Sequence, residues 1–370
     1  MLGYYAHSHG SGHCNYANIF SKIFGSALTI FTDRGHAFDN PEQVVMLENE
    51  NPDGTEFERD DFPEPRALHY APVNIKKITQ RNLIILDSIL QKKISMLIID
   101  VSVEIAMLAR VSSIPYVYVR LQGDRDDIPH LNAYEGASFL LAYYPKEMEA
   151  LDTPAWIIDK TIYLGFLSKF MFGGNISEQP KEYRERLRPI LLYLTGFGGS
   201  LVPDFEGICK DYNMFAIGPS WIRNKAFGFE HIGVVKDTKP YIEHADAIIA
   251  ACGANTTSEI LSLEKKFIAM PEIRHYNEQQ RMAEYLNRNG WAIDLSQHHN
   301  VASALDAINF PKKHNLPNIS VNELKTFKAQ LEFFGYRADR FMDNLKDIHN
   351  SRTVTKGSME NFNSYLSINL

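Results

Sequence analysis

Two glycine-rich segments in the second half of the chain could bind phosphate. CGANTTSEIL (residues 252–261) follows an apolar strand pattern at 247–251, and LLYLTGFGGS (residues 191–200) opens with another such pattern. A strand that turns through glycine into a helix presents backbone N–H groups at the positive helix end, which attract anions. Gly198 and Gly199 would let the backbone approach a ligand closely. Because parallel strands end at one edge of their sheet, we expect both turns to face one cleft.

The N-terminus carries a histidine-rich loop. HSHGSGH (residues 7–13) follows a strand pattern at 2–6 and precedes a helical pattern at 13–24. The loop should therefore lie at the carboxyl edge of a sheet. Imidazole titrates near neutral pH and can take a proton from a hydroxyl group. The dipole at the start of a helix keeps such a histidine neutral, as a resting base requires.

Strands and helices alternate in both halves of the chain. In the first half we predict strands at 2–6, 27–32, 96–100, 116–121, 139–144 and 162–166, and helices at 13–24, 74–92 and 103–111. In the second half we predict strands at 190–194, 214–217, 247–251, 267–270 and 292–295, and helices at 201–211, 256–264 and 277–289. This alternation is typical of α/β proteins in which helices cover both faces of a parallel sheet. Most of the acidic, proline-containing segment 40–72 is expected to be a long excursion from the first sheet.

A chain of 370 residues is expected to form more than one domain. We predict a first Rossmann-like domain at 1–168, a linker at 169–184, a second Rossmann-like domain at 185–318, a closing helix at 319–348 and a loose tail at 349–370. The closing helix is predicted because apolar residues recur there at helical spacing.

Composition limits the partners and the compartment. The net charge is −7, from 38 Lys and Arg against 45 Asp and Glu, and no long basic run is present, so we expect no nucleic-acid partner. The three cysteines are far apart, which favours free thiols in a reducing compartment. The apolar N-terminal run is too short for a signal peptide and no segment has the length of a membrane span, so we expect a cytoplasmic protein.

The segment ACGANTTSE resembles the donor signature CGxNSTxE of UDP-glycosyltransferases. Cys252, Gly253, Asn255, Thr257 and Glu259 fall on matching positions. The family then places an acidic residue and a glutamine in a loop that opens a later helix. HYNEQQRMA supplies these residues as Glu278 and Gln279, followed by Ala283. This pairing is more specific than either glycine-rich turn alone.

The resemblance implies a role for each polar residue of the signature. Asn255 and Thr256 would hold the diphosphate, Glu259 the ribose hydroxyls, and Glu278 and Gln279 the hydroxyls of the donor sugar. Carboxylates accept hydrogen bonds from paired hydroxyls, whereas amides and N–H groups suit anionic oxygens.

The chain departs from the family at two positions. Ala251 stands where many members have a histidine that contacts phosphate, and Met282 stands where asparagine is common. The pattern also resembles the related N-acetylglucosaminyltransferase of peptidoglycan synthesis. In that enzyme, backbone just before this region reads the base, which here implies a contact near Val235.

In the same family, a glycine-rich loop ending in GH supplies the general base. His13 is the matching residue, and Gly10 and Gly12 belong to the matching loop. Plant-type members pair this histidine with an aspartate at the end of a later strand, and Asp100 closes the strand pattern MLIID. Asp100 would stabilise the imidazolium that forms on proton transfer.

The resemblance implies the GT-B fold, in which two Rossmann-like domains face a cleft and a C-terminal helix returns to the first. The expected activity is inverting, metal-independent transfer of a sugar from a UDP-sugar to an acceptor hydroxyl. No cofactor is expected beyond the UDP-sugar co-substrate. The sequence does not identify the acceptor, which is expected to be a small molecule, a glycan or a lipid. The segment FLSKFMF (166–172) could touch a membrane surface, or it could be a buried linker contact.

Other interpretations remain open. A sugar-nucleotide 2-epimerase has a similar double-Rossmann fold, and the missing histidine at position 251 is compatible with a non-catalytic nucleotide-sugar-binding subunit. His7 and His9 with His13 resemble the HxH opening of metal-dependent hydrolases, which would require an eightfold barrel. Thr256 and Glu259 also fit a capping box, which any helix could use.

Overall fold

The computed structural model describes most of the chain up to residue 308 and a short stretch near the C-terminus. The described residues are 1–7, 12–35, 38–50, 63, 65–172, 176–195, 205, 208–219, 228–308, 326–327 and 329–332. They belong to two compact units. The first contains residues 1–121 and 125–169 and the described residues beyond 317, and the second contains residues 122–124 and 170–316.

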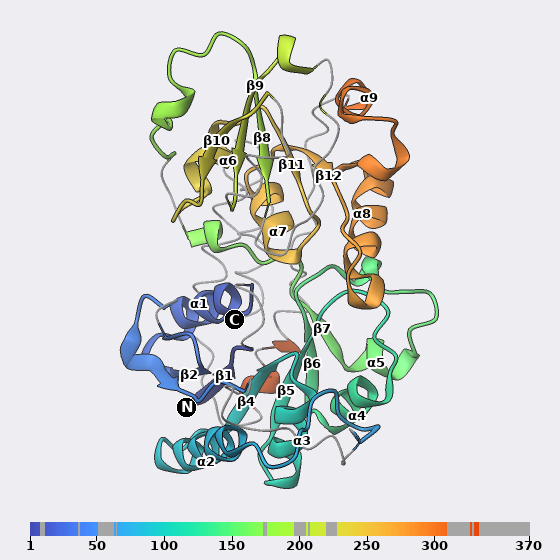
Figure 1. Ribbon diagram of the computed structural model, residues 1–370. Coiled ribbons are helices and arrows are strands. Elements are labelled where there is room, and N and C mark those ends of the chain that lie inside the picture. Colours follow the sequence, from blue (N-terminus) through green and yellow to red (C-terminus); the bar gives the residue numbers. More distant parts are fainter. Residues whose placement is uncertain are drawn as a thin grey trace, which may run out of the picture. The chain divides into compact units, whose positions relative to one another are not determined.

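The first unit is built on a seven-stranded parallel sheet (Figure 1). Its strands are β1 (Leu2–Tyr5), β2 (Leu28–Thr32), β3 (Val44–Met46), β4 (Met96–Asp100), β5 (Tyr116–Arg120), β6 (Phe139–Ala142) and β7 (Thr161–Tyr163). Its helices are α1 (Gly12–Phe24), α2 (Lys76–Gln91), α3 (Val103–Val111), α4 (Ile128–Gly136) and α5 (Ala155–Lys160). The strand order is β3-β2-β1-β4-β5-β6-β7. The order therefore reverses between β1 and β4, where an open parallel sheet forms its ligand-binding crevice.

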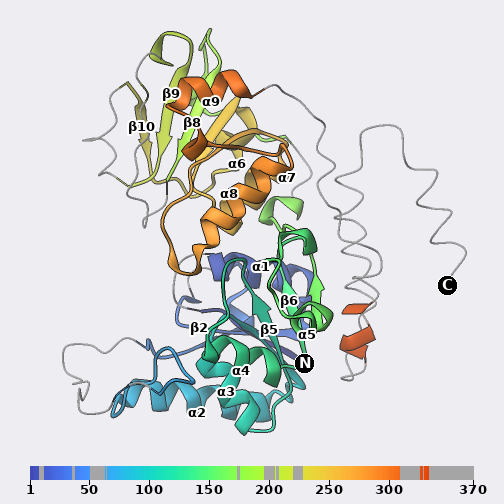
Figure 2. The same ribbon diagram turned by 90° about the vertical axis from the view of Figure 1, so that its right-hand side faces the viewer.

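Helices cover both faces of this first sheet. In Figure 2, α2, α3 and α4 lie side by side along the first sheet. Side chains of α2, α3, α4 and α5 pack on one face in a single apolar cluster with alternate strand residues such as Tyr5 and Leu97. On the other face, Phe20 of α1 packs against Tyr4 with ring centroids 5.3 Å apart. The central strands are almost wholly apolar because both of their faces are buried, as expected for parallel sheets.

The second unit repeats this architecture with six parallel strands. They are β8 (Ile190–Leu194), β9 (Asn213–Ile217), β10 (Glu230–Gly233), β11 (Ala247–Ala250), β12 (Lys266–Ala269) and β13 (Ile293–Asp294). The helices are α6 (Lys239–His244), α7 (Ala254–Ser262), α8 (Glu278–Arg288) and α9 (Val301–Ala307). The strand order is β10-β9-β8-β11-β12-β13, so the reversal lies between β8 and β11.

The predicted strands and most predicted helices are observed within a few residues of their expected bounds, and α3 matches the predicted range 103–111. The segment 40–72 is not wholly an excursion, because β3 adds to the sheet beside β2. Of the predicted helix 201–211, the described part contains only a 3-10 turn at Ile208–Lys210. Strands β3 and β10 and helices α4, α5, α6 and α9 were not predicted. β3 is apolar but only three residues long, and β10 consists of four residues that are at least partly exposed.

The C-terminal part packs on the first unit where the structure describes it. Phe327 and Leu331 are helical and fully buried, and the ring of Phe327 lies 6.1 Å from that of Phe139 in β6. The described helical residues near the C-terminus belong to the first unit, whereas the rest of the predicted closing helix and the predicted tail lie outside the described residues. In the described ranges no helix has both the length and the apolar character needed to span a membrane. Cys14 and Cys252 are free thiols, as predicted.

Candidate functional site

A pocket of about 250 Å³ lies at the point where the strand order of the second sheet reverses. It is lined at the ends of β8 and β11, at the start of α7 and in the loop before α8. The lining residues are Leu194, Thr195, Ile217, Thr238, Ala251, Gly253, Thr256, Glu259, Glu272, Arg274 and Gln279. All of them belong to the second unit. A ligand is expected at this position because the carboxyl ends of the strands leave a crevice there.

The start of α7 supplies one wall of the pocket. Gly253 is the N-cap residue, and no side chain caps the helix. The capping-box interpretation of Thr256 and Glu259 is therefore wrong, because Thr256 already lies in the first helical turn. The first backbone N–H groups of a helix have no partners within that helix, and here Gly253 and Thr256 line the pocket. Uncapped N–H groups beside a cavity suit an anionic group such as a diphosphate.

Glu259 lies one turn further along α7 and also lines the pocket. Its carboxylate Oε2 accepts a hydrogen bond of 3.4 Å from the hydroxyl of Thr238, the residue before α6. Only 8% of Glu259 is exposed. A buried carboxylate that lines the pocket could accept hydrogen bonds from a pair of vicinal hydroxyls.

Glu272 and Arg274 were not singled out in the sequence, yet both line the pocket with Gln279. Arg274 Nη2 lies 2.6 Å from Glu272 Oε2, and the Glu272 side chain is only 7% exposed. The backbone N–H of Glu272 donates to Gln279 Oε1 at 2.9 Å. A signal was present in the sequence, since Glu272 follows the end of a buried strand, where ligand-binding residues gather in parallel sheets.

The structure places some of the predicted donor-binding residues in the pocket lining and others outside it. Gly253, Thr256, Glu259 and Gln279 line the pocket, whereas Asn255, Glu278 and Val235 are not among its lining residues. Gly198 and Gly199 lie outside the described residues.

The loop before α8 is held in an unusual conformation. Tyr276 and Asn277 have φ angles of 62° and 52°, in the left-handed region that few non-glycine residues adopt. Asp124, a residue of the second unit, donates its backbone N–H to the Tyr276 carbonyl at 2.7 Å. Its carboxylate accepts hydrogen bonds from Asn277 and Arg281, each at 3.0 Å. The hydrogen bond from Asn277 and the charge and hydrogen bond of Arg281 lower the pKa of Asp124, so the carboxylate stays ionised. These contacts fix the turn from which Gln279 reaches the pocket.

A histidine–aspartate pair lies where the strand order of the first sheet reverses. His13 is the second residue of α1, and Asp100 is the last residue of β4. His13 Nδ1 lies 3.0 Å from Asp100 Oδ2, with exposed fractions of 15% and 0% for the two side chains. This is an ion-pair distance, although the two atoms are not aligned as a hydrogen bond. Gly12 begins α1, whereas Gly10 lies outside the described residues.

Two buried tyrosines support Asp100. The Tyr4 hydroxyl donates to Asp100 Oδ2 at 3.1 Å, and the Tyr143 hydroxyl lies 3.3 Å from that of Tyr4. Burial and the neighbouring Asp100 raise the pKa of Tyr4 well above its usual range. The tyrosine therefore stays protonated and remains a hydrogen-bond donor that holds the carboxylate. Neither tyrosine was predicted.

The backbone after Asp100 is strained. Val101 has a φ angle of 58°, which is rare for a β-branched residue. The hydroxyl of Tyr118 donates to the Val101 carbonyl at 2.5 Å, and Ser102 caps α3 by accepting from the N–H of Ile105. Strain of this kind persists only where surrounding contacts enforce it, and it concentrates at functional sites.

Comparison with known proteins identifies the architecture. Residues 222–332 match the model of the glycosyltransferase family 28 C-terminal domain. The chain has the GT-B fold. The predicted resemblance to the UDP-glycosyltransferase superfamily of this fold is thereby confirmed. Comparison with curated protein sequences finds no match.

Solved structures of GT-B proteins cover nearly the whole chain. The glycotransferase of kitacinnamycin has a TM-score of 0.55 and 12% identity, covering 95% of this chain and 98% of its own. UGT2 of Phytolacca americana, complexed with UDP-2fluoro-glucose and pterostilbene, has a TM-score of 0.52 and 14% identity, covering 99% of each chain. MurG of Acinetobacter baumannii has a TM-score of 0.51 and 11% identity, covering 94% of this chain and 99% of its own. At these identities the likeness shows the shared fold.

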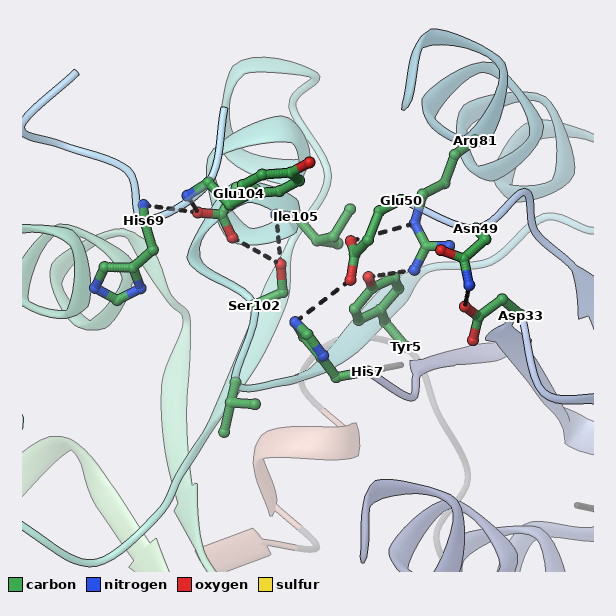
Figure 3. Close-up of polar contacts among 12 residues, drawn as sticks. Tyr5, His7, Asp33, Asn49, Glu50, His69, Arg81, Ser102, Glu104 and Ile105 are labelled. Atoms are coloured by element: carbon green, nitrogen blue, oxygen red, sulfur yellow. Dashed lines mark hydrogen bonds and ion pairs between the residues drawn. The ribbon is translucent and has the colours of Figure 1, made fainter. Parts of the chain in front are cut away.

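His7, which also follows β1 of the GT-B first unit, faces a carboxylate (Figure 3). His7 Nε2 lies 3.8 Å from Glu50 Oε1, and Arg81 Nε lies 3.9 Å from Glu50 Oε2. Arg81 is buried and also donates to the hydroxyl of Tyr5 at 2.5 Å. His7 and His13 have ring centroids 5.8 Å apart, and His9 lies outside the described residues. The metal-dependent hydrolase alternative required an eightfold barrel. The chain forms two open parallel sheets instead, so this alternative is wrong.

His69, Asp127 and His130 form the one group of potential metal ligands among the described residues. Hydrogen bonds within the protein account for this arrangement. Asp127 caps α4 by accepting from the His130 N–H, and its carboxylate lies 2.8 Å from His130 Nδ1 and 3.1 Å from His69 Nε2. Arg125 Nη1 lies 3.2 Å from His130 Nε2. A neutral His130 can donate from Nδ1 to Asp127 and accept from Arg125 at Nε2.

This buried histidine should make stability depend on pH. Burial, together with Arg125, lowers the pKa of His130 from about 6.5 to about 4. The unfolded chain therefore binds a proton that the folded chain excludes, and the free energy of unfolding should fall as the pH drops from about 6.5 to about 4, by up to about 3 kcal/mol. Urea denaturation across this range should show a shallower pH dependence for His130→Asn than for the wild type. Replacement of the exposed His299 is the control, and equal slopes for His130→Asn and wild type would contradict the prediction.

Proposed function

We propose that the chain is an inverting, metal-independent glycosyltransferase that moves a sugar from a UDP-sugar to an acceptor hydroxyl. The observation that carries this proposal is the pocket at the β8/β11 reversal. It lies in a GT-B second unit, and most of its lining belongs to the segment that matches the family 28 C-terminal domain. We assign Glu259 to the ribose, the start of α7 to the diphosphate, and Glu272 and Gln279 to the sugar.

The His13–Asp100 pair would supply the proton chemistry. With Nδ1 turned toward Asp100, Nε2 of His13 would take the proton from the acceptor hydroxyl. The acceptor oxygen then bonds to the anomeric carbon as the bond from that carbon to the phosphate oxygen breaks. Attack opposite the leaving group inverts the configuration. Asp100, fixed by Tyr4, stabilises the imidazolium that forms.

The leaving UDP needs stabilisation of its negative charge. The first turn of α7 offers backbone N–H groups and the positive end of the helix dipole beside the pocket. Donors that are fixed before the reaction stabilise developing charge without reorganising. A mechanism of this kind requires no metal ion and no cofactor besides the donor. We propose a small molecule, a glycan or a lipid as the acceptor, and the cytoplasm as the location.

A thermal-shift comparison of UDP, GDP, dTDP and NAD tests the donor. A ligand that binds only the folded state raises the melting temperature, so UDP should raise it most. A response to NAD alone would overturn the proposal. Incubation with UDP-sugars separates the remaining alternatives, since a 2-epimerase would change the configuration at C2 without an acceptor. A binding subunit would hold UDP without turnover on any acceptor.

A further inference from the structure

Glu272 is a nearly buried carboxylate in the wall of the donor pocket, at the end opposite Glu259 in the proposed ligand order. Its side chain is 7% exposed, which is unusual for a charged group. It lies between β12 and α8, in the segment that the family resemblance leaves without a role. A buried charge needs partners, and those partners determine what Glu272 can still bind.

The contacts of Glu272 fix its orientation. Oε2 accepts from Arg274 at 2.6 Å. The backbone carbonyl of Glu272 accepts from Gln280 Nε2 at 3.0 Å, and its backbone N–H donates to Gln279 at 2.9 Å. Within the described part of the chain, no hydrogen bond is made by Oε1. A carboxylate has lone pairs on both oxygens, so Oε1 can accept a hydrogen bond from a ligand in the pocket.

Gln279 offers the complementary group. Because its Oε1 accepts the backbone N–H of Glu272, the side-chain amide cannot be reversed, and Nε2 must be the NH₂ group. Among the described residues, no hydrogen bond partner takes the protons of Nε2. Glu272 and Gln279 therefore offer one acceptor, Glu272 Oε1, and one donor group, Gln279 Nε2, to a ligand in the pocket.

We propose that Glu272 and Gln279 together read the hydroxyl groups of a neutral donor sugar and discriminate against acidic sugars. This inference rests on the proposed function, since it assigns the sugar class of that donor. A hydroxyl donates and accepts at once, so it can pair with a carboxylate oxygen and an amide NH₂. Glu272, rather than the family-predicted Glu278, is the sugar-reading carboxylate.

Charge opposes a uronic acid in this position. The pocket lining carries two carboxylates, Glu259 and Glu272, and one guanidinium, Arg274. Arg274 is already paired with Glu272. The carboxylate of a uronic acid would either face Glu272 directly or draw Arg274 away and leave Glu272 buried without its partner. Both arrangements are unfavourable for a buried charge.

Isothermal titration calorimetry with UDP, UDP-glucose, UDP-galactose, UDP-N-acetylglucosamine and UDP-glucuronate tests the proposal. The wild type should bind its best neutral donor at least about tenfold tighter than UDP-glucuronate. Glu272→Gln should lower the affinity for that neutral donor by about tenfold or more, since the loss of a hydrogen bond to a charged group has an effect of this size. The affinity of Glu272→Gln for UDP should stay unchanged, because the proposed assignment places Glu272 beside the sugar and not beside the nucleotide. Glu278→Gln is the matched control and should bind every ligand as the wild type does.

The outcomes separate this inference from the proposed function. Equal binding of the neutral donor by Glu272→Gln and wild type, or a preference for UDP-glucuronate, overturns the assignment of Glu272 while UDP binding stands. If Glu278→Gln lowers the affinity for the neutral donor and Glu272→Gln does not, the sugar-binding carboxylate is Glu278, as the family resemblance implies. If the wild type binds no UDP ligand, the proposed donor fails and the inference with it. Thermal melting of each unliganded variant shows whether it is folded.

Discussion

Replacement of His13 by alanine should lower kcat for sugar transfer by about 10²–10⁴-fold, the usual contribution of a general base. Donor binding should be unaffected, because the donor pocket belongs entirely to the second unit. The measurement is release of UDP in the presence of an acceptor found by screening. His7→Ala is a matched control. Its ring lies 5.8 Å from that of His13, but it faces Glu50 rather than Asp100.

Asp100→Asn should also lower kcat, by at least about tenfold, because the imidazolium loses its stabilising charge. If Asp100 acts through His13, the double variant should lose no more activity than His13→Ala alone, since residues that act as one unit are not additive. If the losses of activity add in the double variant, His13 and Asp100 act independently of each other. Full turnover by His13→Ala would remove His13 as the base and leave the donor site untouched.

Replacement of Gly253 by valine should weaken UDP binding by roughly 10- to 100-fold, since overfilling a packed site costs about 1–3 kcal/mol. Gly253 lines the pocket at the start of α7, and a Cβ there would meet no described atom within 4 Å, so the side chain would enter the space that the ligand needs. The φ angle of −64° is ordinary for any residue. The melting temperature of the unliganded protein should therefore stay near the wild-type value.

Calorimetry with UDP measures this effect, and Gly253→Ala should give an intermediate loss because only one carbon is added. A loss of UDP binding accompanied by a large fall in melting temperature would indicate damage to α7 rather than blocking of the pocket. Undiminished UDP binding by Gly253→Val would place the diphosphate elsewhere.

The sequence alone determined the two parallel sheets and the regions where ligands should bind. Central strands such as β4 and β11 are buried on both faces, so they appear as continuous apolar runs, and the polar or glycine-rich residues that end them mark the carboxyl edge of each sheet. Gly253 lies at such an edge, whereas His13, Asp100 and Glu259 were singled out by the resemblance to glycosyltransferases. Edge strands are harder to predict, because β3 is an apolar run of only three residues and the four residues of β10 are at least partly exposed.

Tertiary structure decided which side chains meet. Tyr4 and Tyr143 are 139 positions apart, and only the pairing of the strands between them brings their hydroxyls together beside Asp100. In the loop before α8, the choice between Glu272 and Glu278 depends on the left-handed turn at Tyr276 and Asn277, which sequence spacing does not specify. Sequence patterns record burial along one element, whereas the direction of a loop side chain is set by contacts with distant residues.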